Sequence, residues 1–385
     1  MLFAKLNDLS IGGKGAYGIA ASAVERKADL PTYLRITDIF DDGTLNLSEL
    51  KSVDAPNSDK YLLKPNDIVF ARTGGSTGRN YFYDGSDGVF VYAGFLIKFS
   101  IDPEKVNPKY VKYYCRSKQY NDWVQSFNTG STRGNINAQT FGNMEIPLPE
   151  RKQQDYLVSI LEPIDEKIKN NKQVNDNLQQ QAMSLYAEMF LNSSDSNVTS
   201  GTLSDIAVIT MGQSPSGSSY NEDGVGEVFY QGRAEFGFRF PKRRLFTTEP
   251  KRMVEAGDVL LSVRAPVGDL NIAYERCCIG RGLGAIHSKT GHSSFILYTM
   301  FALRSQLDVF NGEGTVFGSI NRDALNAIPI DIPPVTEIDQ FEVVAHPIDE
   351  LIRANYEENC RLEAIRDSLL PKLMSGEIDV SAVQL

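Results

Sequence analysis

The sequence predicts an α+β protein with two globular α/β heads and two long antiparallel coiled-coil helices, arranged as a pseudo-twofold internal repeat. Three observations lead to this fold class. The chain repeats itself at an offset of 184 residues, each half contains one heptad pattern, and short apolar runs typical of strands precede each heptad. Solenoid repeats are roughly 20 to 50 residues long, so a repeat of this length predicts duplicated domains.

The repeat is closest where each half changes from strand-like to heptad sequence. There, GSTRGNINAQTFGNMEIPLP (residues 130–149) aligns without a gap with GTVFGSINRDALNAIPIDIP (314–333), and EPIDEKIKNN (162–171) aligns with HPIDELIRAN (346–355). The chain therefore divides into four predicted segments: head 1 (residues 1–149), arm 1 (150–191), head 2 (192–333) and arm 2 (334–385).

Farther upstream the repeat needs small gaps, and the heads diverge from each other more than the arms do. KPNDIVFAR (64–72) resembles EAGDVLLSVR (255–264), and VYAGFLI (91–97) resembles IGRGLGA (279–285). Similar arms with dissimilar heads would follow from two heads that recognise two different sequences.

Short apolar runs in each head predict strands, for example DIVFA (67–71), VFVYAGFLIKF (89–99) and DVLLSV (258–263). One amphipathic helix is expected to follow in each head, and in head 1 it begins at Asn107-Pro108. We assign to the core the apolar side chains of these helices, namely Tyr110, Val111, Tyr114, Trp123, Phe127, Phe295, Tyr298, Phe301 and Leu307.

Each arm carries a coiled-coil seam, marked by a strict alternation of four-residue and three-residue steps. Pro163 and Pro347 occupy equivalent positions near the start of the seams, where we expect them to begin a straight helical section or to kink it. The seams consist of Leu157, Leu161, Ile164, Ile168, Asn171, Asn175, Leu178, Ala182, Leu185 and Met189 in arm 1, and of Phe341, Ala345, Ile348, Ile352, Asn355, Asn359, Leu362, Arg366, Leu369 and Leu373 in arm 2.

Two asparagines lie at the centre of each seam. An amide facing leucine would lose its hydrogen bonds, so such residues select register and partner. We expect antiparallel arms with Asn171 opposite Asn359 and Asn175 opposite Asn355. The alternative is that each seam packs only on its own head. Arg366 interrupts the second seam, so that end of arm 2 is expected to fray or to pair with an acidic residue.

The net charge of −10 is distributed unevenly. Residues 334–385 carry 4 basic and 11 acidic side chains, whereas residues 1–149 carry 17 basic and 16 acidic side chains. The heads are therefore close to neutral and can each present a basic face to nucleic acid. The clearest candidate is RAEFGFRFPKRRLF (233–246), for which a solvated loop is the alternative interpretation.

The composition argues against a membrane protein and against a metal site. No apolar run approaches the roughly 18 residues that span a bilayer, and MLFAKLNDLS lacks the pattern of a signal peptide, so we expect a cytoplasmic protein. The four cysteines show no C-x-x-C spacing and the chain has three histidines. Buried free thiols are therefore expected.

Loops rich in glycine, hydroxyl and basic residues lie between the predicted strands, namely ARTGGSTGRN (71–80), GQSPSGSSYN (212–221) and VRAPVGDLN (263–271). Glycine lets a backbone approach a phosphate, serine and threonine donate to phosphate oxygens, and arginine binds guanine or phosphate through two hydrogen bonds. Each loop alone is a weak signal. The candidates for DNA contact are Arg72, Thr73, Ser76, Arg79, Arg133, Gln231, Arg233, Arg243 and Arg264.

Catalytic signatures do not stand out in the sequence. It has no G-x-x-x-x-G-K-[ST] loop, and DIPP (331–334) is not followed by the aromatic residue of an amino-methyltransferase motif. We therefore expect a non-catalytic chain whose partners carry out the chemistry. A nuclease or methyltransferase in its own right would be active as the purified chain with metal or S-adenosylmethionine. A two-headed protein-interaction scaffold without DNA specificity is the alternative, which suits the acidic total.

The two junctions, residues 130–171 and 314–355, resemble those between recognition domain and conserved helix in the specificity subunit of type I restriction-modification systems, and the order head, arm, head, arm extends the resemblance to the whole chain. One departure is Ile338, which stands where the first half has Gln154, so partner contacts are expected to differ there.

The resemblance implies two target-recognition domains, set in inverted orientation by an antiparallel helix pair. Each would read one half of a bipartite, asymmetric site in double-stranded DNA. The resemblance further implies assembly with two modification (methyltransferase) subunits, which use S-adenosylmethionine, and with restriction subunits, which use ATP and Mg²⁺. No cofactor is expected in this chain itself.

Overall fold

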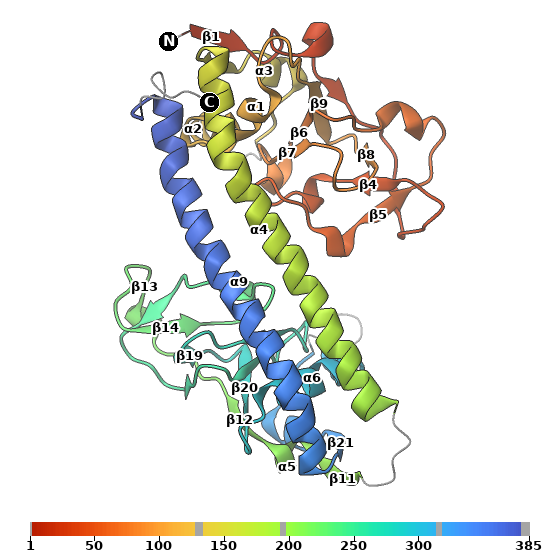
Figure 1. The fold of residues 1–385 in the computed structure, drawn as a ribbon, viewed down its shortest axis with the longest axis vertical. Helices are drawn as coiled ribbons and strands as arrows, with labels where there is room; N and C mark the ends of the chain where they lie inside the picture. The colour runs from red at the N-terminus through yellow and green to blue at the C-terminus, as the bar shows by residue number, and fades with distance from the viewer. Residues whose placement is uncertain (1, 128–133, 193–197, 313–317, 379–385) are drawn as a thin grey trace. The chain divides into compact units, whose positions relative to one another are not determined.

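The computed structural model confirms the predicted fold class. It describes residues 2–127, 134–192, 198–312 and 318–378. The chain divides into two compact units, unit 1 (Met1–Lys169 with Asn359–Leu385) and unit 2 (Asn170–Glu358). Each unit contains one head and part of two long helices, α4 (Arg151–Tyr186) and α9 (Val335–Ser375), which are drawn in Figure 1. Within the described ranges, no helix is long and apolar enough to cross a membrane.

Head 1 contains two sheets. Their strands are β2 (Ala16–Tyr17), β9 (Leu96–Ser100), β6 (Asp67–Ala71) and β7 (Asn80–Tyr83) in the first, and β3 (Ala23–Val24), β5 (Lys51–Val53), β4 (Thr32–Leu34) and β8 (Phe90–Tyr92) in the second. The first sheet is antiparallel in the order β2-β9-β6-β7. The second has the order β3-β5-β4-β8, with β4 and β8 parallel. Every residue of β6 is buried, which explains its continuous apolar run.

Head 2 repeats this topology and adds a fifth strand to the second sheet. Its strands are β12 (Ala207–Met211), β20 (Leu283–Ser288), β17 (Val259–Ser262) and β18 (Leu270–Ile272) in the first sheet, and β13 (Tyr220–Asn221), β15 (Phe246–Thr247), β14 (Glu227–Tyr230), β19 (Cys277–Ile279) and β16 (Met253–Val254) in the second. The orders are β12-β20-β17-β18 and β13-β15-β14-β19-β16, and β14 and β19 run parallel as β4 and β8 do. The duplication seen in the sequence is therefore a duplication of strand order.

A two-stranded ribbon closes each head next to its arm. These ribbons pair β1 (Leu2–Lys5) with β10 (Glu145–Leu148), and β11 (Thr199–Thr202) with β21 (Pro329–Ile332). The repeated Ile-Asn pair lies just before a short helix that leads to the second strand of each ribbon. Asn137 caps α3 (Ala138–Gly142) through the Thr140 amide, and Asn321 caps α8 (Arg322–Asn326) through the Ala324 amide.

The prediction of one amphipathic helix per head is wrong, because each is broken in two. Head 1 has α1 (Pro108–Tyr114) and α2 (Lys118–Gln125), and head 2 has α6 (Ser293–Ala302) and α7 (Arg304–Asp308). In head 1 the break has a local cause. The Asn80 side chain donates to the Cys115 carbonyl at 3.0 Å, and Ser117 accepts from the Tyr120 amide to start the second helix.

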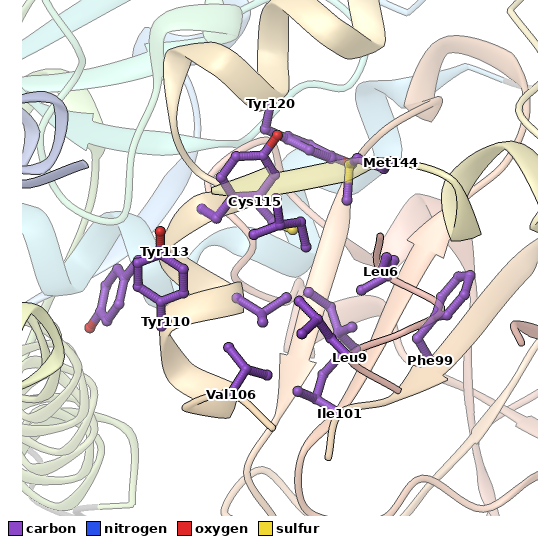
Figure 2. Close-up of a cluster of buried hydrophobic side chains, with 14 of the residues drawn as sticks. Leu6, Leu9, Phe99, Ile101, Val106, Tyr110, Tyr113, Cys115, Tyr120 and Met144 are labelled. Carbon is purple, nitrogen blue, oxygen red and sulfur yellow. The ribbon is translucent and has the colours of Figure 1, made fainter. Parts of the chain in front are cut away.

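The core of head 1 is sealed by residues from both arms. Figure 2 shows aromatic and aliphatic side chains of α1, of β9 and of the segment that follows β1 packed together, among them Tyr110, Phe99 and Leu6. The same cluster includes Leu157 of α4 and Leu373 of α9. Head 2 has a matching core that includes Ala182 and Tyr186 of α4 and Ile338, Phe341 and Ala345 of α9. Apolar burial therefore ties each head to both helices.

The two long helices pack antiparallel in unit 2. Asn175 of α4 contacts Asn355 of α9, and farther along α4 the ring of Tyr186 lies 5.6 Å from that of Phe341. Contacts within this unit thus move to lower numbers on α9 as they move to higher numbers on α4. In unit 1, Asp165 of α4 contacts Arg366 of α9. The helices also run through the repeated prolines, because α4 begins at Arg151 and α9 at Val335, upstream of Pro163 and Pro347.

Amides occupy the seam in unit 2. Asn355 donates through Nδ2 to Asn175 Oδ1 at 2.8 Å, and Asn175 donates to the Ile352 carbonyl at 3.3 Å. Asn171 donates to Glu358 Oε2 at 2.8 Å. Arg366 is not frayed, because its guanidinium pairs with Asp165 at 3.3 Å. The expectation that it finds an acidic partner is confirmed.

The expectation of buried free thiols holds for three of the four cysteines. Cys115, Cys277 and Cys278 are buried in the heads, but Cys360 is exposed on α9. Its position just after Asn359, which faces the seam, places it on the outer side of the helix. The prediction was wrong for Cys360, because the side of the helix on which a residue lies decides its burial, whatever its type.

The repeated Pro-Ile-Asp-Glu sequence fastens each long helix to a head. In unit 1, Asp165 accepts from the Tyr113 hydroxyl of α1 at 3.0 Å and pairs with Arg116 at 2.8 Å and with Lys112 at 3.0 Å. Its carboxyl is buried, which opposes ionisation, but Arg116, Lys112 and Arg366 together hold its pKa at about 2.

In unit 2, Asp349 occupies the equivalent position on α9 and makes the equivalent bond. It accepts from the Tyr298 hydroxyl of α6 at 2.8 Å and pairs with the buried Arg239 at 3.4 Å. The Arg239 guanidinium also lies 5.7 Å from the ring of Phe301. Each unit therefore has a joint, meaning the contact between its head and a long helix, and one tyrosine-to-aspartate hydrogen bond is common to both joints.

Gln154 has a structural role in its own unit. Its side chain accepts from the Asn107 amide at 2.8 Å and donates to the Pro149 carbonyl, so it satisfies the N-terminus of α1. In unit 2, Glu342 of α9 accepts from the Ser294 and Phe295 amides at the start of α6. The missing glutamine is thus compensated one helical turn farther along.

We predict that Asp165→Asn destabilises unit 1 by about 3 kcal/mol at pH 7, because three cationic groups lose their buried counter-charge. The only tryptophan of the chain, Trp123, packs against the unit 1 core, so urea unfolding followed by its fluorescence reports on this unit. Asp122→Asn, which removes only the exposed i,i+4 pair with Lys118, should cost a few tenths of a kcal/mol. Equal effects of the two variants would contradict the role of Asp165.

The effect should also depend on pH. A carboxyl whose pKa is lowered from 3.8 to about 2 contributes stability that is present above about 3.8 and is lost as the pH falls towards 2. The gap between the unfolding midpoints of the parent protein and Asp165→Asn should therefore be the same at pH 7 and pH 5 and smaller at pH 3. A gap that stays constant across this range would contradict the assignment.

Candidate nucleic-acid interface

The predicted contact loop of head 1 follows β6. The Arg72 guanidinium lies 5.2 Å from the ring of Tyr17, and its Nε is buried without a hydrogen-bond partner among the described residues. Thr73 forms an isolated bridge with Asn135. Arg72 and Thr73 therefore sit where the loop after β6 meets the segment that leads to α3.

Two other candidates in this loop hold the loop itself. Ser76 is buried in a short 3-10 turn, Gly74–Ser76. Arg79 pairs with Asp41 at 2.6 Å and donates to the Ile39 carbonyl. Arg133, the fifth candidate of head 1, lies outside the described residues.

In head 2 the structure brings Gln231 and Arg264 together. Gln231 follows β14, and its backbone lies so close to Gly280 and Gly282 that a Cβ atom on either glycine would come within 2.7 or 3.0 Å of the Gln231 carbonyl oxygen. Arg264 is exposed and adjoins Val263, whose amide donates to the Gly282 carbonyl. No ion pair of the Arg264 guanidinium occurs within the described part of the chain.

The other two candidates of head 2 are engaged elsewhere. Arg233 pairs with Asp269, which also receives Arg304, beside a cleft of about 550 Å³. Arg243 pairs with Glu275 and lies 5.7 Å from the ring of Tyr274.

Tyr274 connects this region of head 2 to α9. Its hydroxyl donates to Glu357 at 2.9 Å, and the Arg353 guanidinium lies 4.7 Å from its ring. Arg243 therefore belongs to the joint between head 2 and α9.

Two short turns occupy equivalent places in the two heads, tip 1 (residues 93–95) and tip 2 (residues 280–282). The same hydrogen bonds build both. Leu96 donates to the Ala93 carbonyl as Leu283 donates to the Gly280 carbonyl. In addition, Phe95 accepts from the Arg72 amide as Gly282 accepts from the Val263 amide.

These bonds correct the upstream alignment by one residue. VYAGFLI and IGRGLGA match with Tyr92 opposite Ile279, because those residues pair with Leu34 and Tyr230 at the same point of the parallel ladders. Likewise Thr73 is the counterpart of Arg264, since each bridges to an equivalent residue, Asn135 or Ser319.

Sequence reasoning missed the residues carried by these tips. Arg281 of tip 2 is exposed, and its Nε and backbone amide point at Ser214 Oγ, at 3.4 and 3.2 Å. Phe95 of tip 1 is 58% exposed. Both residues lie in the repeated segments VYAGFLI and IGRGLGA. With the alignment shifted by one residue, Arg281 stands opposite Gly94, and this difference between the heads marks Arg281 as a candidate for contact.

The loops of each head thus offer guanidinium, amide and hydroxyl groups together with close-packed glycines, which is the chemistry of nucleic-acid contact. The described residues contain no group of three or more His, Cys, Asp or Glu side chains that could hold a metal ion.

Comparison with known proteins identifies the family. A family model described as type I restriction modification DNA specificity domain matches the chain twice, at residues 25–180 and 195–359. The chain is 30% identical to a putative type I restriction enzyme MjaX specificity subunit of Methanocaldococcus jannaschii, over 83% of this chain and 80% of that protein. It is 22% identical to the type I restriction enzyme HindI specificity subunit of Haemophilus influenzae, over 92% of this chain and 97% of that protein.

The fold also has a solved counterpart. The S subunit of a type I restriction-modification system from M. genitalium matches with a TM-score of 0.56 and 17% identity, over 97% of this chain and 95% of that one. The two family matches fall on the two halves of the duplicated fold and together cover most of the chain. The chain therefore belongs to the type I restriction modification DNA specificity family.

Proposed function

We propose that this chain is the DNA sequence-recognition subunit of a type I restriction-modification complex. The observation that carries the proposal is the match of the specificity-domain family to both halves of the chain. Each head would read one half of a bipartite, asymmetric site in double-stranded DNA. Heads of the same topology with different side chains on their tips support this division of labour, because an asymmetric site requires two different readers.

In this proposal residues 1–149 and 192–333 are the target-recognition domains, and residues 150–191 and 334–385 are the conserved helical arms. The chain itself is non-catalytic. It assembles with two modification subunits that bring S-adenosylmethionine, and with restriction subunits that use ATP and Mg²⁺. Asn171, Asn175, Asn355 and Asn359 fix the register of the arms.

We assign direct DNA contact to Arg72, Thr73, Gln231 and Arg264. The two arginines fit this role because neither is neutralised by a carboxylate within the described residues. Ser76 and Arg79 shape the head 1 loop, and Arg233 and Arg243 are held by acidic partners of head 2. Arg133 stays a candidate for contact on the basis of its sequence context alone.

The proposal predicts salt-sensitive binding to duplex DNA. The full chain in complex with its modification subunits should bind a duplex that carries the methylated motif of the source genome. Its affinity should fall steeply as salt rises from 50 to 200 mM, because phosphate contacts release counterions. An electrophoretic shift series measures this. Binding that is absent, or that does not respond to salt, would favour the alternative of a two-headed protein scaffold.

Arg264→Ala and Arg243→Ala form a matched pair in head 2. We expect Arg264→Ala to weaken DNA binding roughly tenfold, since the lost guanidinium contacts DNA in this proposal and has no carboxylate partner among the described residues. Arg243→Ala should leave the affinity within about twofold, because its charge is already engaged by Glu275. Titration of labelled duplex against each complex measures both. Equal losses for the two variants would contradict the division between contact and joint.

A further inference from the structure

Building on the proposed function, we infer that the two tips read bases: Arg281 of tip 2 recognises a guanine in one half-site, and Phe95 of tip 1 contacts the methyl group of a thymine in the other. The tips adjoin the residues assigned to DNA contact. Tip 1 is bonded to the backbone of Arg72, and tip 2 packs on the backbone of Gln231 beside Arg264.

Arg281 is held in a way that leaves two donors free for a guanine. Its Nε and backbone amide both approach Ser214 Oγ, at 3.4 and 3.2 Å, so the base of the guanidinium is fixed, and its two terminal nitrogens have no hydrogen-bond partner among the described residues. The structure shows no carboxylate paired with it within the described residues. Two parallel N–H groups match the O6 and N7 acceptors that guanine presents in the major groove.

The surroundings of Arg281 keep it stiff and accessible. Both neighbours in the tip are glycines, so no adjacent side chain shields the guanidinium. A Cβ atom on Gly212 would lie 2.1 Å from the Gly280 carbonyl oxygen, so the strands below the tip are packed closely. A rigid support of this kind favours base reading over loose phosphate contact, because bidentate bonds need a fixed orientation.

Tip 1 has the same backbone with different chemistry. Gly94 takes the place of Arg281, Ala20 takes the place of Ser214, and Phe95 takes the place of Gly282. Because tip 2 forms the same turn with glycine, the turn itself does not require the phenyl ring. That ring is nevertheless 58% exposed. An exposed aromatic group fits the apolar methyl of thymine, the feature that distinguishes thymine in the major groove.

Each test variant carries the residue found at the equivalent position of the other head, which is Gly94 for Arg281 and Gly282 for Phe95. The same turn therefore already forms with glycine at that position. Arg281→Gly and Phe95→Gly are prepared in the full chain, in complex with the modification subunits. Each complex selects duplexes from a randomised library, and the bound pool is sequenced. Ser214→Ala serves as a positioning variant, and intact folding of each variant chain is checked by circular dichroism before the complex is assembled.

Arg281→Gly should reduce the preference for guanine about tenfold or more at one position of one half-site and leave the other half-site unchanged. Phe95→Gly should reduce the preference for thymine at one position of the opposite half-site. Ser214→Ala should reduce the same guanine preference as Arg281→Gly, to a smaller degree.

Several results would overturn the inference while leaving DNA recognition intact. These are an unchanged motif in both glycine variants, a uniform loss of affinity with the motif preserved, and a loss of preference in both half-sites from either single change. If the unaltered complex selects no motif at all, the proposed function fails and the inference fails with it. The behaviour of the unaltered complex therefore separates the two failures.

Discussion

The hydrogen bond from a head tyrosine to an arm aspartate is the constraint on which both units depend. Asp165 receives Tyr113 in unit 1 and Asp349 receives Tyr298 in unit 2. Each aspartate lies one helical turn or less from the repeated proline and faces the head, so the orientation of the long helix is fixed against the head helix. The surrounding cations make this position intolerant of a neutral residue.

Around that shared bond the two units use different residues for the same tasks. The start of the head helix is satisfied by Gln154 in unit 1 and by Glu342 in unit 2. Beside it, Asn107 contacts Asp155, whereas His292 contacts the equivalent Asp339. Where a head meets a long helix, the two units use different residues but keep the same arrangement. In the exposed tips the backbone hydrogen bonds are the same, and the side chains differ in chemistry. This pattern separates what positions a head from what the head presents.

The sequence was sufficient for the features that depend on periodicity. The antiparallel seams and the duplicated heads follow from spacing, because a heptad and an offset repeat are visible without coordinates. Side-chain roles were harder to predict. Arg243 and Arg264 look alike in sequence, and only the positions of Glu275 and Tyr274 show that Arg243 is engaged. The predicted alignment of VYAGFLI with IGRGLGA was off by one residue. The sequences of such short strands fit each other in more than one register, and only the hydrogen bonds between strands fix the register.

The two units differ in the number of chain segments that form them. Unit 2 is one continuous segment, Asn170–Glu358, whereas the unit 1 core needs Leu370, Leu373 and Met374 from α9. During synthesis on the ribosome, domains usually complete their folding in order from the N-terminus. Here the order is reversed, because head 1 emerges first and must wait for the last helix before its core can close. A nascent chain therefore exposes unfinished apolar surface of its first domain throughout the translation of its second.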